Sequence, residues 1–67
     1  MNKEAIKKAI KADDLTTAIA DIGGEEYKMF IQCCSDGLYS VDFGGRLGDI
    51  EAVVNLLARM NIKEIFY

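Results

Sequence analysis

Two strand-like runs separated by a short turn lie in the middle of the chain. Residues 27–34, YKMFIQCC, and residues 38–43, LYSVDF, are rich in apolar and aromatic residues and flank the sequence Ser-Asp-Gly. Runs of this kind on either side of a glycine-containing turn predict a β-hairpin. We therefore expect two antiparallel strands here.

The register of this hairpin depends on the length of its turn. A two-residue turn pairs Cys34 with Tyr39 and mixes polar and apolar side chains on both faces, whereas a three-residue turn makes one face apolar throughout. A slip of one residue exchanges the faces of a strand, so burial should select the apolar pairing. We expect a type I turn followed by Gly37 in the left-handed conformation. The expected pairs are Cys33 with Tyr39, Ile31 with Val41 and Met29 with Phe43.

Residues 49–60, DIEAVVNLLARM, have the clearest helical pattern in the chain. Asp49 is a natural N-cap, Glu51 suits the positive end of the helix, and Asn61 can end it. Residues 62–67, IKEIFY, then form a short final strand. The apolar stripe of the helix consists of Ile50, Val53, Leu56, Leu57 and Met60.

The first 22 residues carry two apolar stripes at helical spacing that point in opposite directions. We expect the helix to break near Asp13 and Asp14, where an aspartate caps a second helix that ends at Gly23–Gly24. The alternative makes residues 15–22 a strand that turns back at the two glycines, and the sequence does not decide whether this segment is helix or strand. The first stripe is Ile6, Ala9 and Ile10, and the second is Leu15, Ala18, Ile19 and Ile22.

These elements predict a single α+β domain over residues 1–67, in the order α(α)-β-β-α-β. A helix that joins two strands favours a right-handed crossover. The simplest arrangement places the last strand antiparallel beside residues 27–34, which gives a three-stranded antiparallel sheet of order 2-1-3 packed with helices. The strand of residues 38–43 is then a free edge, where two chains could join their sheets.

Small size and high apolar content point to association. The chain has 67 residues, of which 51% are hydrophobic. A domain of this size buries about 60% of its unfolded surface, and oligomerisation often supplements its stability. We therefore expect a homodimer, or a partner protein that covers apolar surface.

The sequence indicates a cytoplasmic protein. Its first 14 residues carry charges throughout and lack the apolar core of a signal peptide. No apolar run approaches the about 18 residues of a membrane span, so no membrane association is expected. Two cysteines do not make a disulfide framework.

The adjacent pair Cys33–Cys34 is a weak candidate for chemistry. Neighbours on a strand point to opposite faces, and a redox pair normally has residues between its cysteines. The chain contains no histidine to activate a thiol or bind zinc, and two cysteines are too few for a four-thiolate site. It also lacks a calcium-loop pattern and a nucleophile elbow. We expect no enzyme activity, no cofactor and no metal.

The glycine-rich run GGRLGD is the best candidate site for a small ligand. It precedes a helix N-terminus, a position that can bind a phosphate or another anion. The run matches neither GxxxxGK[ST] nor GxGxxG, and Asp49 and Glu51 would repel an anion. The candidate ligand-binding residues are Gly44, Gly45, Arg46 and Gly48.

Charge is unevenly distributed along the chain. Residues 1–12 contain four lysines and one glutamate, and residues 13–26 contain five acids and no base. Lys3, Lys7, Lys8 and Lys11 share one side of a helix and could contact nucleic acid, which the net charge of −3 disfavours. The acidic candidates for binding a basic partner protein are Asp13, Asp14, Asp21, Glu25 and Glu26. A second candidate interface is the mixed sheet face at Phe30, Cys34 and Leu38.

In size, acidity and lack of a catalytic set, the chain is similar to the small acidic proteins with which phages and mobile elements block host defence enzymes, anti-CRISPR proteins among them. The likeness is one of build and covers no motif. It implies a non-enzymatic viral protein that binds and inhibits a partner protein, which is our leading hypothesis. One alternative is a homo-oligomer that binds or sequesters a nucleotide or other anion with Arg46 and the loop Gly44–Gly48. Another is a nucleic-acid accessory protein that uses the N-terminal lysine helix.

Overall fold

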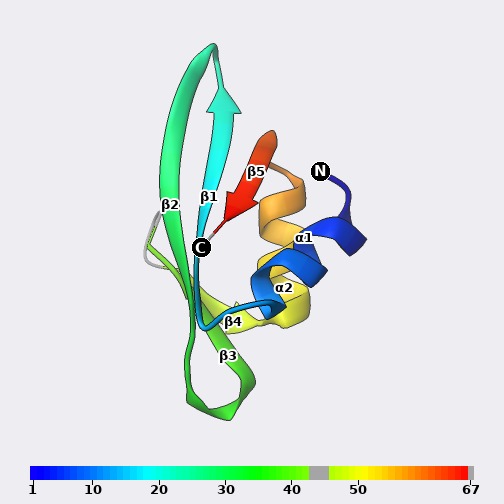
Figure 1. Cartoon of the computed structure of the whole chain (residues 1–67), viewed down its shortest axis with the longest axis vertical. Helices are drawn as coiled ribbons and strands as arrows, with labels where there is room; N and C mark the ends of the chain where they lie inside the picture. The colour runs from blue at the N-terminus through cyan, green and yellow to red at the C-terminus, as the bar shows by residue number, and fades with distance from the viewer. Residues whose placement is uncertain (43–45, 67) are drawn as a thin grey trace.

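Within the described residues, 1–42 and 46–66, the computed structural model has two α-helices and one five-stranded antiparallel sheet (Figure 1). Neighbouring strands follow the spatial order β4-β3-β2-β1-β5. In chain order the elements are α1 (Lys3–Lys11), β1 (Leu15–Ile22), β2 (Glu25–Cys33), a 3-10 turn (Ser35–Gly37), β3 (Leu38–Val41), β4 (Arg46–Asp49), α2 (Ile50–Ala58) and β5 (Ile62–Phe66).

Residues 15–22 form strand β1, so the expected second helix is wrong and the alternative is confirmed. Burial in β1 follows a period of two, with Thr16, Ala18 and Ala20 buried. Leu15 and Ile22, two members of the expected helical stripe, are exposed. The strand prevails because β1 has hydrogen-bonded neighbours on both sides, β2 and β5, which no helix at this position could have.

The turns at the two ends of β1 also differ from the expectation. Gly23 and Gly24 have φ values of 62° and 84°, which suit a two-residue hairpin turn between β1 and β2. They do not end a helix. At the other end the predicted break after the first helix is confirmed, but Asp13 caps no helix. Its Oδ1 accepts a hydrogen bond from the N–H of Asp14 at 2.7 Å.

The additional strands change the predicted sheet. The expected three strands in order 2-1-3 are wrong, because β5 pairs with β1 and residues 46–49 form β4 beside β3. The observed order along the chain is α-β-β-β-β-α-β. Strand β3 therefore has a neighbour on each side, and the edges of the sheet are β4 and β5. The α+β class itself is confirmed.

The register of the β2–β3 hairpin is the one that burial was expected to select. Cys33 pairs with Tyr39, and Ile31 pairs with Val41. The third expected pair, Met29 with Phe43, lies partly outside the described residues. Gly37 is left-handed as predicted, with φ 74°, but Asp36 is also left-handed, with φ 65°, so the turn is not of type I.

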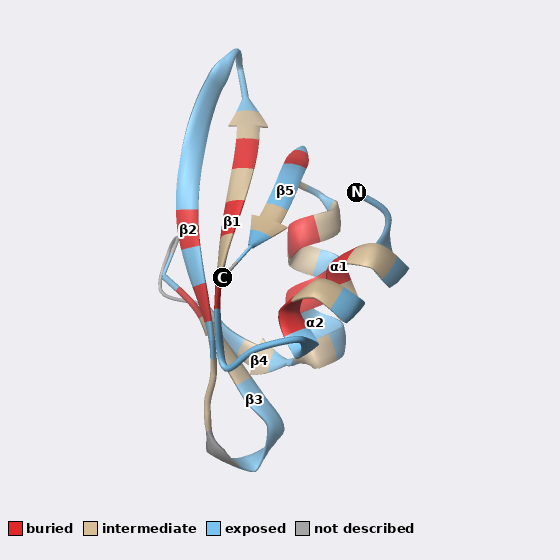
Figure 2. Ribbon diagram, viewed as in Figure 1, coloured by how far each residue is buried: buried red, intermediate tan, exposed pale blue. Residues whose placement is uncertain are grey.

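Both helices pack on the same face of the sheet, and the core lies between them and the strands (Figure 2). The predicted stripe of α2 is confirmed at Val53 and Leu57, and Val54 is buried as well. Helix α2 ends at Ala58, three residues before the expected end at Asn61. The buried apolar core comprises Ile6, Ile10, Ala18, Ala20, Met29, Ile31, Val41, Val53, Val54, Leu57 and Ile62.

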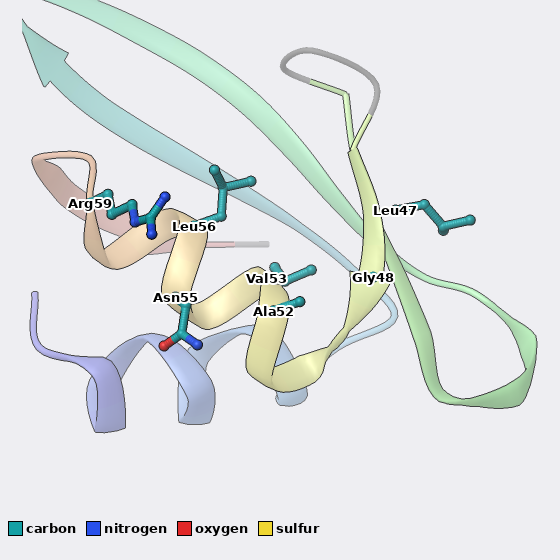
Figure 3. Close-up of a pocket in the computed structure, with 7 residues that line it drawn as sticks. All are labelled: Leu47, Gly48, Ala52, Val53, Asn55, Leu56 and Arg59. Atoms are coloured by element: carbon teal, nitrogen blue, oxygen red, sulfur yellow. The ribbon is translucent and has the colours of Figure 1, made fainter.

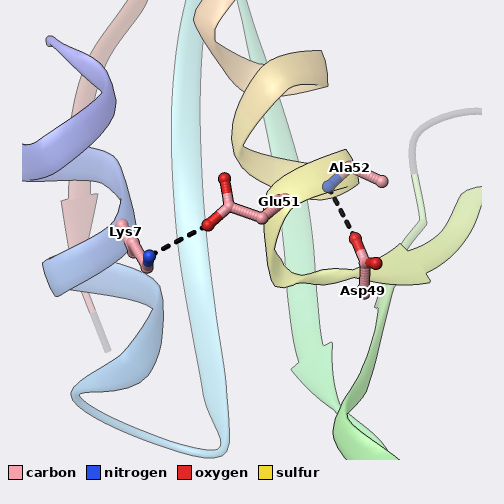
Figure 4. Close-up of polar contacts among 4 residues, drawn as sticks. All are labelled: Lys7, Asp49, Glu51 and Ala52. Atoms are coloured by element: carbon pink, nitrogen blue, oxygen red, sulfur yellow. Dashed lines mark hydrogen bonds and ion pairs between the residues drawn. The ribbon is translucent and has the colours of Figure 1, made fainter.

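Polar contacts fix the first turn of α2 against its neighbours (Figure 4). Asp49 is the N-cap, as predicted, and its Oδ1 accepts from the N–H of Ala52 at 2.8 Å. Lys7 of α1 forms an ion pair with Glu51, with 3.0 Å between Nζ and Oε1. The hydrogen bond to Glu51, followed by its charge, raises the pKa of Lys7 above the ordinary 10.5.

Candidate functional site

One face of the sheet is covered by α1 and α2, and neither helix lies on the opposite face (Figure 1). Side chains alternate between the faces of a strand, so the neighbours of buried strand residues lie on the side away from the helices. Five large apolar residues occupy such positions and are between 37% and 63% exposed. They are Leu15, Phe30, Leu38, Leu47 and Phe66. We call this side of the sheet the open face.

The strand register arranges four of these residues in two neighbouring rows, and Leu38 lies in a third row opposite Asp49. Phe30 and Phe66 flank Thr17 in register, and neighbouring strands are about 4.8 Å apart, so the backbones of the two phenylalanines are separated by about 10 Å. The adjacent row runs from Leu15 through two polar residues to Leu47. Together the five side chains expose roughly 500 Å² of apolar surface, in rows that Thr17, Gln32 and Ser40 interrupt.

Carboxylates outnumber cations on the open face. Asp21 and Glu26 are cross-strand partners near the tip of the β1–β2 hairpin, Glu64 is in register with Ile19, and Asp42 Oδ1 accepts from the N–H of Phe30 at 2.8 Å. The cations are Lys28, in register with Ile19, and Lys63, which reaches Glu26. The four lysines of α1 lie on the helix side of the sheet, where Lys7 is paired with Glu51.

The ion pair on the open face links β5 to β2 across β1. Lys63 Nζ donates to Glu26 Oε2 at 2.7 Å. This hydrogen bond, followed by the charge of Lys63, holds the pKa of Glu26 below its ordinary value of 4.5. The same contact raises the pKa of Lys63 above 10.5. Both side chains are about half exposed, so the pair orients the hairpin tip with little effect on stability.

The five acidic candidates from the sequence form two separate groups. Asp13 and Asp14 lie between α1 and β1, whereas Asp21, Glu25 and Glu26 lie at the tip of the hairpin (Figure 1). The eight residues of β1 separate the groups by about 25 Å. A partner that contacts both groups must therefore extend along the whole hairpin.

Two of the three predicted sheet-face residues lie on the open face, Phe30 and Leu38. Cys34 follows β2 and is half-buried, and its Sγ donates to the carbonyl oxygen of Gln32 at 3.8 Å. Cys33 is also half-buried and lies beside Tyr39, whose pKa is raised by burial and then by this cysteine. Both cysteines are free thiols.

Sequence reasoning missed three open-face residues, Leu15, Leu47 and Phe66. The sequence favours a helix over a strand at Leu15, predicts a loop at Leu47, and gives Phe66 a strand with a different neighbour. The alternation of Thr16, Ala18 and Ala20 fits a strand, but the same residues fit a helical stripe, and no local signal identifies the neighbours of Phe66.

The candidate anion site is described only in part. Gly44 and Gly45 lie outside the described residues, and Arg46 is described only through its backbone in β4. Gly48 has a packing role, since a Cβ added there would lie 3.1 Å from the Cβ of Ala52. Among the described residues, no three side chains of the metal-binding types come together.

Neither helix in the described part of the chain is long and apolar enough to cross a membrane. Comparison with known proteins adds no relative, because no family model, no curated protein and no solved structure matches the chain.

Proposed function

We propose that this protein is a non-enzymatic protein-binding module whose open face packs against a partner protein and inhibits it by covering its surface. The observation that supports this proposal is the set of five large, exposed apolar side chains on the sheet face that neither α1 nor α2 covers. A stable interface takes about 800 Å² from each partner. That is about a fifth of the 4320 Å² surface of this chain, an area on the scale of one face of the sheet.

The charges on the open face indicate the chemistry of the partner. Its carboxylates lie beside the row of Phe30 and Phe66 and towards the hairpin tip, so the matching surface has an apolar region bordered by a basic rim. If a second copy of this chain packed against the open face, two faces with an excess of carboxylates would repel each other. This repulsion favours a different protein as the partner. Nucleic-acid bases could stack on Phe30 and Phe66, but the same carboxylates would repel the phosphates.

Inhibition by coverage fits the class of phage and mobile-element inhibitors that the build of the chain suggests. A protein that blocks a surface needs area and complementary charge, and it needs no catalytic group. The acidic hairpin tip would extend the contact beyond the apolar rows, with Asp21 and Glu26 facing the basic rim of the partner.

The test is capture of the partner from the native host with a matched set of variants. Phe30→Thr with Phe66→Thr removes two apolar side chains from the open face while keeping residues that favour strands. Ile22→Thr is the control, because Ile22 is 40% exposed, close to the 42% of Phe66, but occupies the helix-side position of the alternation. We expect the wild type and Ile22→Thr to retain the same protein, and the double variant to bind it at least tenfold more weakly.

Three further measurements use the purified pair. Raising the salt concentration should slow association, because the rims carry opposite charge. Saturating the partner with this protein should abolish the partner's activity. Full activity of the partner in the complex would refute inhibition. Equal affinity of both variant proteins for the partner would refute the open face as the binding surface.

Light scattering of the protein alone tests the alternative that a second copy of this chain covers the open face. A homodimer that the Phe30→Thr, Phe66→Thr variant converts to monomer would assign the open face to a second copy and overturn the proposal. Salt-sensitive binding of an oligonucleotide, lost in the same variant, would also overturn it.

A further inference from the structure

A groove lies between the edge strand β4 and helix α2, on the helix side of the sheet (Figure 3). Its volume is about 240 Å³, and its walls include Gly48 of β4 and Ala52, Val53 and Leu56 of α2. Figure 3 shows Ala52 and Val53 pointing from α2 towards β4, while Leu47 points away from α2. Leu47, an open-face residue, also lines the groove, so the groove meets the open face at β4 while its α2 wall lies on the helix side.

The groove runs beside unpaired backbone. Among the described residues, β4 pairs with β3 alone, so alternate residues of Arg46–Asp49 direct their N–H and C=O groups outward. The opposite edge, β5, is protected against strand pairing by a register irregularity opposite Ile19 and Ala20 and by the charged residues Lys63 and Glu64. The pairing of β4 with β3 is regular over all four residues.

The rim of the groove carries a cation and an amide. Asn55 of α2 and Arg59, the C-cap residue of this helix, are about one helical turn apart, and both are exposed. The ion pairs of the described residues are Lys7–Glu51 and Lys63–Glu26, and Arg59 takes part in neither. A carboxylate bound at this rim would therefore find a cation without a competing partner.

We infer that the groove and the β4 edge bind an extended acidic peptide segment. The segment adds to β4 as a sixth strand, places one apolar side chain against Val53 and Leu56, and sets an acidic side chain beside Arg59. Strand addition supplies backbone hydrogen bonds, and the groove supplies selectivity for the side chain. Because β4 has only four residues, the ladder is short and the apolar side chain must provide much of the affinity.

Fluorescence anisotropy with a synthetic probe tests the inference on the intact protein. The probe is a labelled, C-terminally amidated decapeptide of alternating threonine and valine, with a central leucine and a glutamate two positions later. We expect saturable binding that weakens about tenfold to thirtyfold when the leucine becomes alanine. It should weaken about threefold when the glutamate becomes glutamine.

Two N-methylated probes distinguish strand addition from general adhesion. Each carries methyl groups on one of the two alternate sets of amides near the leucine. Only one set can donate to β4, so one probe should bind about tenfold more weakly and the other should bind like the parent. Equal binding of both to the level of the parent would overturn strand addition.

Protein variants locate the site. Arg59→Gln changes an exposed side chain. This variant should bind the glutamate and glutamine probes equally, and its affinity for the glutamine probe should equal that of the wild type. Leu56→Gln should weaken all probes, while Phe30→Thr with Phe66→Thr should leave them unchanged. Weaker binding of the probe to the Phe30→Thr, Phe66→Thr protein, or no saturable binding at about 1 mM protein, would overturn the inference. The proposed partner contact on the open face is unaffected by either result.

Discussion

Replacing Gly48 with alanine tests whether this glycine is required for packing between β4 and α2. The added Cβ would lie 3.1 Å from the Cβ of Ala52. Two carbon atoms are in optimal contact at about 3.5–4.0 Å, so one element must move by about half an ångström. Neither moves freely, because β4 is hydrogen-bonded to β3 and the first turn of α2 is held by its cap and by the ion pair to α1 (Figure 4).

The expected loss follows from two opposing effects. Overpacking of this kind costs about 1–3 kcal/mol. Replacing a glycine inside a strand returns about 0.5–1 kcal/mol of backbone entropy. We expect Gly48→Ala to lower the free energy of unfolding by about 1 kcal/mol, which lowers Tm by about 4–8 °C in a domain of this size.

Urea unfolding followed by circular dichroism measures this loss, and a double-mutant cycle identifies its cause. Ala52→Gly alone should cost about 1 kcal/mol through helix propensity. In the Ala52→Gly background the clash is absent, so Gly48→Ala should be neutral or slightly stabilising, with a coupling of about 1–2 kcal/mol. Full stability of Gly48→Ala, or strict additivity of the two changes, would refute the packing argument and return Gly48 to the list of ligand candidates.

Three further perturbations test local features of the fold. Asp49→Ala should lower the free energy of unfolding by about 1 kcal/mol because the N–H of Ala52 loses its acceptor. Asp49→Asn should retain most of the stability that the cap contributes, and equal losses in the two variants would argue against capping. Gly24→Ala should cost about 1–2 kcal/mol in urea unfolding because its φ is 84°, and an unchanged midpoint would contradict the described turn. The Glu26–Lys63 pair lowers the pKa of Glu26, so its contribution is present above the unfolded pKa of 4.5 and is lost as the pH falls below it. Because the pair is half exposed, Glu26→Gln should reduce the fall in Tm between about pH 5 and 3 only slightly, and an unaltered acid limb would show that the pair does not act in solution.

The parts of the fold that could be predicted are those specified by local pattern. Helix α2 was predicted from its apolar spacing and its cap at Asp49, and both are properties of a few consecutive residues. The register of β2 with β3 was predicted because only one pairing made a face apolar, and the observed pairing of Cys33 with Tyr39 confirms it. These features need no information from distant segments.

Strand β1 could not be predicted with the same method. Its residues fit a helical stripe and a strand alternation equally well, and apolar side chains lie on both of its sides. The choice depends on β5, whose Phe66 is in register with Thr17 from nearly the other end of the chain. Strand β4 is a similar case, because the glycine-rich run becomes a strand only through its pairing with β3.

By itself the sequence determined the α+β class, the central hairpin with its register, and the capped helix α2. It also contained the candidates Phe30 and Leu38. Only the tertiary structure decided that both helices cover one face of a five-stranded sheet, which brings Leu15, Leu47 and Phe66 together with those two residues on the other face. The physical reason is that periodicity records which side of an element is apolar. Which neighbour covers that side, or leaves it open to a partner, is set by contacts between residues far apart in the chain.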